Sequence, residues 1–123
     1  MYMTIEECYQ QMGGNINQVM SRLPSQKLVE KFVVKFLDDL SFSTLCEEME
    51  KENRQEAFRA AHTLKGVCAN LSFDRLQNSA SRLTEVLRIE SDTIPEEAWP
   101  LMDEVRTHYQ CTVDAIHDFQ NSK

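Results

Sequence analysis

The chain has 123 residues, of which 41% are hydrophobic and 27% charged, and its formal net charge is −7. This length and composition suit one globular domain, residues 1–123, with a core that needs no disulfide or metal. The acidic balance disfavours binding to phosphate backbones and anionic lipid, and no stretch approaches the ~20 uninterrupted apolar residues of a membrane span. We therefore expect neither a nucleic acid nor a membrane as partner. Glycine and proline occur three times each, which is too seldom for an all-β fold.

Hydrophobic residues recur with a period close to 3.6 along almost the whole chain, which predicts helices throughout. In chain order, we expect helices over about 4–11, 15–22, 24–39, 43–52, 54–71 and 73–90, and a last one ending near 119. Thr4 and Glu7 form a capping box for the first helix, and Gly13 and Gly14 end it. Pro24 suits the first turn of the third, and Ser41 or Ser43 the cap of the fourth.

The start of the last helix is open to two interpretations. Thr93 and Glu96 have the spacing of a capping box, but Pro100 would then remove a hydrogen bond one turn later. The helix therefore either begins near Trp99 or is kinked there. Four long helices with short links predict an all-α fold, an antiparallel up-down four-helix bundle with one or two short accessory N-terminal helices.

The four cysteines and the N-terminal sequence indicate the cellular compartment of the protein. Cys8, Cys46, Cys68 and Cys111 contain no C-x-x-C pair, and each occupies an apolar position of a helical pattern. We interpret them as small core residues of a protein in the reducing cytoplasm. The first residues lack the basic and long apolar regions of a signal peptide, which also favours a cytoplasmic location. His108 and Cys111 are three apart, but two ligands make no site, so we expect no metal.

Residues 57–71 carry the most informative pattern. In a helical projection the core line holds Ala57, Ala60, Ala61, Leu64, Cys68 and Leu71. His62 projects roughly 140° away from this line. Lys65 and Ala69 flank it on one side and Gly66 on the other, and Phe58 precedes it by one turn. A histidine thus stands outside the core beside a lysine and a mid-helix glycine.

Each of these residue types suits a reversible group transfer. Imidazole is nucleophilic at neutral pH and forms a reactive phosphoramidate. Lys65, one turn from His62, can place an ammonium beside a phosphoryl group on that ring. Gly66 costs the helix about 1 kcal/mol relative to alanine, and its missing side chain would let another protein's backbone approach. The pattern alone leaves an ordinary solvated surface as an equal alternative.

The run Ala-His-Thr-Leu-Lys-Gly at 61–66, continued by Ala-Asn-Leu at 69–71, resembles the signature of histidine-containing phosphotransfer (HPt) domains. The segments 36–40 and 56–61 are also similar, and the spacing agrees over about 28–90. The resemblance implies a four-helix bundle with accessory N-terminal helices. It implies that His62 is the phospho-acceptor, that Lys65 stabilises the phosphoryl group, and that Gly66 opens access for a partner.

The resemblance also implies supporting residues and departures. Arg88 lies where some members place a basic residue near the histidine, and Phe58, Gly66 and Ala69 would form the docking surface. Many members have glycine where this chain has Ser72. Many have Gln or Glu in place of Thr84, and that side chain hydrogen-bonds the non-reacting imidazole nitrogen. Threonine is short for this role, so a water or Glu85 would take it over.

The implied function is that of a phosphorelay intermediate in two-component signal transduction. A hybrid sensor kinase or its receiver phosphorylates His62, which exchanges the group with an aspartate of a response-regulator receiver domain. The chain would be a phosphocarrier rather than an enzyme, without an ATP site or a cofactor, and magnesium is expected on the receiver only.

Two other functions are consistent with parts of the sequence. A non-transferring docking or adaptor module for receiver domains would keep the docking surface, and the departure at Thr84 motivates it. An acyl carrier is suggested by size and charge, but the Asp-Ser-Leu attachment motif is missing and Asp39-Leu40-Ser41 has the wrong order.

Overall fold

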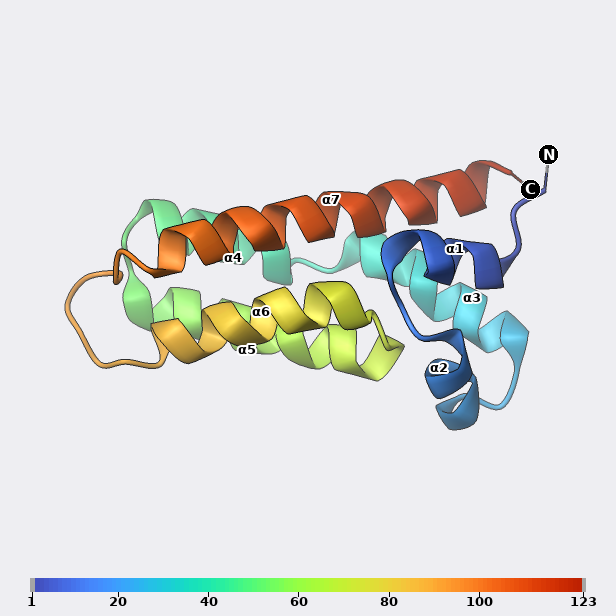
Figure 1. Cartoon of the computed structure of the whole chain (residues 1–123), viewed down its shortest axis with the longest axis horizontal. Helices are drawn as coiled ribbons and strands as arrows, with labels where there is room; N and C mark the ends of the chain where they lie inside the picture. The colour runs from blue at the N-terminus through green and yellow to red at the C-terminus, as the bar shows by residue number, and fades with distance from the viewer. Residues whose placement is uncertain (1, 123) are drawn as a thin grey trace.

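The computed structural model describes residues 2–122, and within them the chain is all-helical, with no strand. Figure 1 shows the elements along the chain. They are α1 (Ile5–Met12), α2 (Ile16–Arg22), α3 (Gln26–Lys35), the 3₁₀-helix η1 (Phe36–Asp38), α4 (Ser41–Glu50), α5 (Arg54–Leu71), α6 (Asp74–Leu87) and α7 (Ala98–Asn121).

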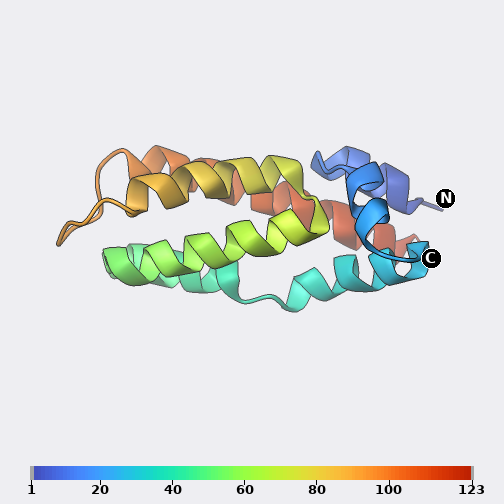
Figure 2. The same ribbon diagram turned by 90° about the horizontal axis from the view of Figure 1, so that it is seen from below.

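The longer helices lie side by side along the long axis of the molecule. In both ribbon views α3 and α4 follow one another as a single interrupted rod, and consecutive long helices run in opposite directions (Figures 1 and 2). Helix α5 packs between α4 and α6, and α6 packs on α7. Helix α1 packs on the C-terminal half of α7. The two short helices α1 and α2 therefore cover the end of the molecule that also holds the C-terminal end of α5.

One continuous cluster of buried side chains joins all these helices. Aromatic rings connect its N-terminal and central parts: the centroids of Tyr9 and Phe73 are 5.6 Å apart, and those of Phe36 and Phe73 are 5.2 Å apart. Because α1 and η1 reach the same ring of Phe73, the accessory segment belongs to the core that supports α5.

The caps of α1 agree with the sequence analysis. The Thr4 hydroxyl accepts from the backbone N–H of Glu7, and the Glu7 carboxylate accepts from the N–H of Thr4. Gly13 ends the helix with φ 75°, in the left-handed region where only glycine is unstrained. The predicted capping box and break are therefore confirmed.

The helix predicted over 24–39 is present over 26–38, but Pro24 precedes it instead of lying in its first turn, and the predicted serine caps of the next helix are wrong. Helix α3 begins after Ser25, whose hydroxyl accepts from the N–H of Leu28, and it tightens into η1 after Lys35. The cap near α4 is supplied by Asp39, whose carboxylate accepts from the N–H of Ser41. Leu40 is 72% exposed because it stands between η1 and α4.

Helix α7 settles the choice between its two predicted starts. It begins at Ala98, so Pro100 falls in the first turn, where a missing N–H breaks no intrahelical bond. The predicted Thr93–Glu96 box does not form, because the N–H of Thr93 donates to the Ser91 hydroxyl in the preceding loop.

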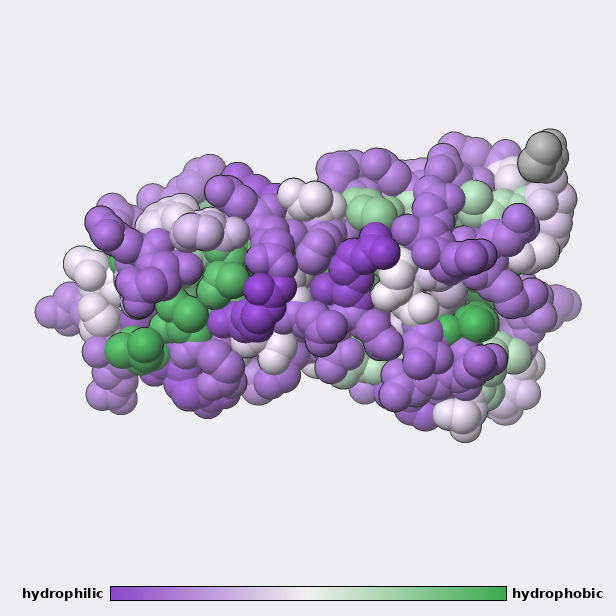
Figure 3. Space-filling model, in the orientation of Figure 1, coloured by the Kyte–Doolittle hydropathy of each residue, from purple (hydrophilic) through white to green (hydrophobic). Residues whose placement is uncertain are grey.

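The surface is mostly hydrophilic. Figure 3 shows apolar surface gathered where α6 and α7 approach their shared loop, and the exposed Ile89 and Trp99 flank this loop. Two of the four free cysteines, Cys8 and Cys68, are buried as expected, whereas Cys46 and Cys111 are only half-buried.

Across residues 2–122, the helices are all too short or too polar to cross a membrane.

Candidate functional site

Helix α5 presents a buried face and an outer strip, and the outer strip carries the candidate site. The residues predicted for the core line are the ones that are buried: Ala57, Ala60, Ala61, Leu64, Cys68 and Leu71. His62 is exposed on the other side, and the boundaries of the helix are those predicted. Because the buried face is packed on both sides, by α4 and α6, the outer strip has a fixed orientation.

The N-terminal end of α5 is tied to the C-terminal end of α6. The Arg54 guanidinium donates to the carbonyl of Leu87 at 2.6 Å and to that of Ser91 at 2.9 Å. Both carbonyls belong to the end of α6 or the loop after it, where acceptors lack intrahelical partners. These bonds set the register between the helices and bring Arg88 level with Phe58.

The C-terminal end of α5 is tied to the accessory segment. The Tyr9 hydroxyl donates to the carbonyl of Leu71 at 2.7 Å, and the Arg22 guanidinium donates to that of Ala69 at 2.9 Å. The helix ends at Ser72, which has φ 58°, and its hydroxyl accepts a further bond from Arg22. The N–H of Asn15 donates to the Ser72 carbonyl at 2.8 Å. Residues of α1, of α2 and of the turn between them thus donate hydrogen bonds to backbone carbonyls at the C-terminal end of α5 that have no partner within the helix.

A stack of side chains surrounds His62. The imidazole lies nearly parallel to the Phe58 ring, with centroids 6.0 Å apart and 14° between the planes. The guanidinium carbon of Arg88 lies 5.1 Å from the centroid of the same Phe58 ring, in cation–π geometry. Arg88 also pairs with Glu85, at 3.2 Å between Nη2 and Oε1. Phe58 therefore contacts both the imidazole and a cation from the neighbouring helix.

Glu85 interacts electrostatically with the same group of residues. The hydrogen bond from Arg88 and the charge of Arg88 hold the pKa of the Glu85 carboxyl below its ordinary value, and the charges of Lys65 and His62 act in the same direction. Sequence reasoning gave Glu85 only a substitute role toward the imidazole. Its spacing of three from Arg88 is the signal that could have indicated the ion pair.

Open space surrounds the glycine next to this group. An ideal Cβ built on Gly66 meets no neighbouring atom within 4 Å, so the fold itself does not require glycine there. Lys65 and Ala69, on the same outer strip, are half-buried. The structure thus brings Phe58, His62 and Arg88 together and leaves an unobstructed surface at Gly66.

Thr84 is placed differently from the other predicted residues. It is fully buried, and its hydroxyl donates to the carbonyl of Ala80 at 2.7 Å, one turn back in α6. Within the part of the chain that the structure describes, no hydrogen bond joins the imidazole of His62 to Thr84 or Glu85. The residue of α6 that turns toward the site is Glu85, one position further along.

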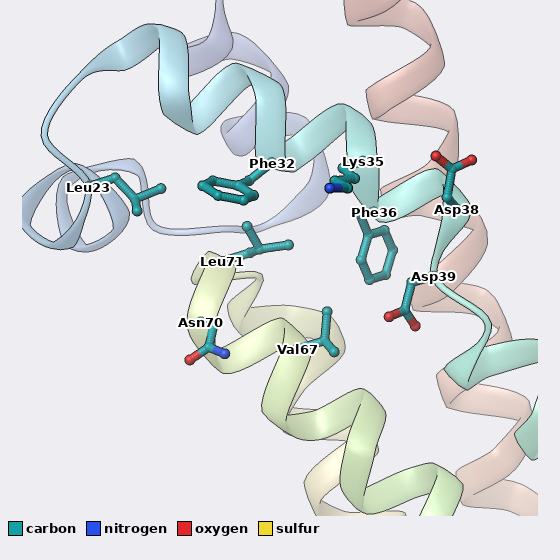
Figure 4. A pocket seen from close by; sticks show the side chains of 9 residues that line it. All are labelled: Leu23, Phe32, Lys35, Phe36, Asp38, Asp39, Val67, Asn70 and Leu71. Atoms are coloured by element: carbon teal, nitrogen blue, oxygen red, sulfur yellow. The ribbon is translucent and has the colours of Figure 1, made fainter.

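A groove of about 530 Å³ lies beside the outer strip, between α3 and the C-terminal half of α5. Figure 4 shows Phe32 and Phe36 facing Val67 and Leu71 across it, with Asp39 at one end. The lining is largely apolar, and Phe32 is 38% exposed. The groove therefore extends the outer strip of α5 with an apolar hollow that begins one residue past Gly66.

No cluster of three or more His, Cys, Asp or Glu side chains suited to a metal ion occurs among residues 2–122. His108, considered above with Cys111, instead contacts the Ser79 hydroxyl through Nδ1 at 3.1 Å. The Cys111 thiol donates to the carbonyl of Gln11. Both side chains are therefore engaged in contacts between helices.

Comparison with known families agrees with this arrangement. The family model described as Hpt domain matches residues 27–115, which is more than two thirds of the chain, so the chain belongs to the Hpt domain family. Searches of curated proteins and of solved structures found no match. Hpt domains are phosphocarriers in histidine phosphotransfer of two-component phosphorelays, where they interact with response-regulator receiver domains.

Proposed function

We propose that His62 is the phospho-acceptor of this Hpt domain and that it exchanges its phosphoryl group with the aspartate of a response-regulator receiver domain. The observation that carries the proposal is the exposed imidazole on a rigid helix, beside Lys65 and an unobstructed Gly66. A hybrid sensor kinase or its receiver would supply the group. We also infer that residues 1–123 act as one domain whose four long rods form an antiparallel up-down bundle, with α1 and α2 as its accessory helices.

The proposed transfer is an in-line displacement. A nitrogen of the neutral imidazole attacks the phosphorus of the aspartyl phosphate, a P–N bond forms, and the P–O bond breaks with its electron pair going to the carboxylate. The reverse step returns the group. We propose that the receiver supplies the magnesium ion and that this chain contributes no cofactor. Lys65 and Arg88 are the cations that would offset the transferred charge on this side.

The docking surface proposed for the receiver is the strip of Phe58, Gly66 and Ala69. Phe58 gives it an apolar platform next to the imidazole, and the two small residues let a partner's backbone come close. Phe58 also restrains the imidazole plane, which reduces the orientational freedom lost in the transfer step.

The test is transfer of label from a phosphorylated receiver domain of the same cell. Wild type and His117→Gln, which changes another exposed histidine, should accept label, whereas His62→Gln should not. The label should be lost in acid and kept in alkali, as expected of a phosphoramidate. Label on His62→Gln, or binding of the receiver without any label on wild type, would refute the assignment; the second result would indicate an adaptor.

A further inference from the structure

One of the cations near His62, Arg88, is already paired with a carboxylate. Both oxygens of Glu85 accept from Arg88, at 3.2 Å from Nη2 and 3.3 Å from Nε. Arg88 in turn lies over the Phe58 ring, which is stacked on the imidazole. The ion pair and the phospho-acceptor therefore share the Phe58 ring as a common neighbour.

The same carboxylate also interacts with the second cation. Lys65 lies one turn after His62 on α5, while Glu85 and Arg88 come from α6, and the charges of Lys65 and His62 both lower the pKa of the Glu85 carboxyl. The charged groups near the imidazole are thus Lys65 and Arg59 on its own helix, of which Arg59 is paired with Glu56, and the Glu85–Arg88 pair on the helix packed against it.

A phosphoryl group on His62 would enter this arrangement as a strong competitor. Phosphoryl groups carry about −1.5 to −2 charges near neutral pH, and their oxygens accept hydrogen bonds from arginine and lysine. The group would repel the Glu85 carboxylate and attract both Lys65 and Arg88, the cation that Glu85 pairs with. Arg88 and Lys65 cannot serve both anions fully.

We propose that Glu85 competes with the phosphoryl group of His62 for Arg88 and Lys65, and thereby limits how strongly this domain holds the group. The proposal rests on the phosphorylation of His62 proposed above. A carrier has to release what it accepts, and cations that bind the phosphohistidine as tightly as the transition state would slow its departure. Glu85 keeps that ground-state binding weak.

The probe is phosphoramidate, a small donor that needs no docking. Its P–N bond breaks, ammonia leaves, and a new P–N bond forms on the imidazole. The ³¹P resonance of the labelled protein is then followed against pH in wild type, Glu85→Gln and Glu85→Asp. The matched control is Glu48→Gln, because Glu48 forms the same type of i, i+3 ion pair with Lys51, at 3.6 Å, at the end of α4 rather than on the histidine-bearing helix.

Removing the negative neighbour should favour the deprotonated phosphohistidine, whether its ring or its phosphoryl group titrates. The acid dissociation constant read from the ³¹P resonance should rise about threefold in Glu85→Gln, the size expected for exposed charges. Glu85→Asp and Glu48→Gln should stay near wild type. The difference should shrink in 1 M salt, where screening acts over about 3 Å. Circular dichroism should be unchanged, because Glu85 is exposed.

The outcomes separate this inference from the function on which it rests. An unchanged titration in Glu85→Gln, an equal change in Glu48→Gln, or a difference that survives 1 M salt overturns the competition while phosphorylation stands. Glu85→Asp behaving like Glu85→Gln also overturns it, because the charge is then not what matters. If wild type takes no label, or if His62→Gln takes as much, the proposed function fails and the inference falls with it.

Discussion

The Gly66→Gln variant separates docking from folding more sharply than any other change at the site. An ideal Cβ at position 66 meets nothing within 4 Å, so the longer side chain extends into open space rather than into a neighbouring helix. Glutamine is a better helix former than glycine by about 0.5 kcal/mol. For a chain of this size, that gain raises the melting temperature by about 2 °C.

The same side chain stands one turn from His62, where a receiver has to bring its phosphorus within bonding range of the imidazole. Holding the two proteins apart by ~1 Å costs on the order of a hundredfold in rate. We therefore expect a more stable protein whose transfer from a receiver is slowed about a hundredfold. Labelling by phosphoramidate, which is small, should stay close to the wild-type rate.

The assay measures melting temperature, receiver transfer and phosphoramidate labelling on the same samples. Thr107→Gln is the matched control, because it also places glutamine at an exposed helical position, on α7. It should keep wild-type rates with both donors. If Gly66→Gln unfolds, the glycine serves helix packing and the orientation of the outer strip is wrong. If it folds and accepts from a receiver at the normal rate, the docking geometry is wrong.

Three further changes test other parts of the structure. Lys65→Ala should slow single-turnover transfer about tenfold while leaving receiver affinity, measured by calorimetry, unchanged; an unaltered rate would remove its role. Ser72→Gly should be more stable to urea than Ser72→Ala by about 1 kcal/mol, because both lose the hydroxyl but only glycine is relaxed at φ 58°; equal stabilities would contradict this reasoning. Burial, together with the charge of Asp118, raises the pKa of the Cys8 thiol from 9.0 to about 12, so the folded state retains a proton that the unfolded state loses. Stability should be intact below pH 9 and fall as pH rises toward 12, with Cys8 costing at most about 2 kcal/mol at pH 10.5. Urea unfolding at pH 8 and 10.5 checks this, and Cys8→Ala should reduce the difference between the two.

Helix α5 shows what periodicity can predict. Its boundaries, 54–71, and its six buried residues follow from spacing alone, since small and apolar side chains recur on one line and Asn53 can cap the start. The break between the third and fourth helices was predicted, but its form was not. The apolar spacing runs on to Leu40, so it indicates neither the 3₁₀ turn that begins at Phe36 nor the cap from Asp39.

The candidate site likewise has a part that the sequence predicts and a part that it does not. His62, Lys65 and Gly66 lie within five residues of one helix, so their spacing alone predicts that they share a surface. The contact between Phe58 and Arg88 joins two helices, and it depends on a register that Arg54 sets by binding carbonyls at the end of α6. Successive residues of a helix point in directions about 100° apart, so on α6 Thr84 faces the core whereas Glu85 faces the site.

The bonds that close the C-terminal end of α5 have a consequence for how the domain is delimited. The family match starts at residue 27, whereas Tyr9, Asn15 and Arg22, which bind the carbonyls of Leu71, Ser72 and Ala69, all precede it. A fragment cut at the family boundary would keep every residue of the phosphotransfer signature. It would also leave three acceptors at the end of the histidine-bearing helix without these donors and uncover the ring of Phe73. The segment least recognisable as part of the family is thus the one that terminates its signature helix.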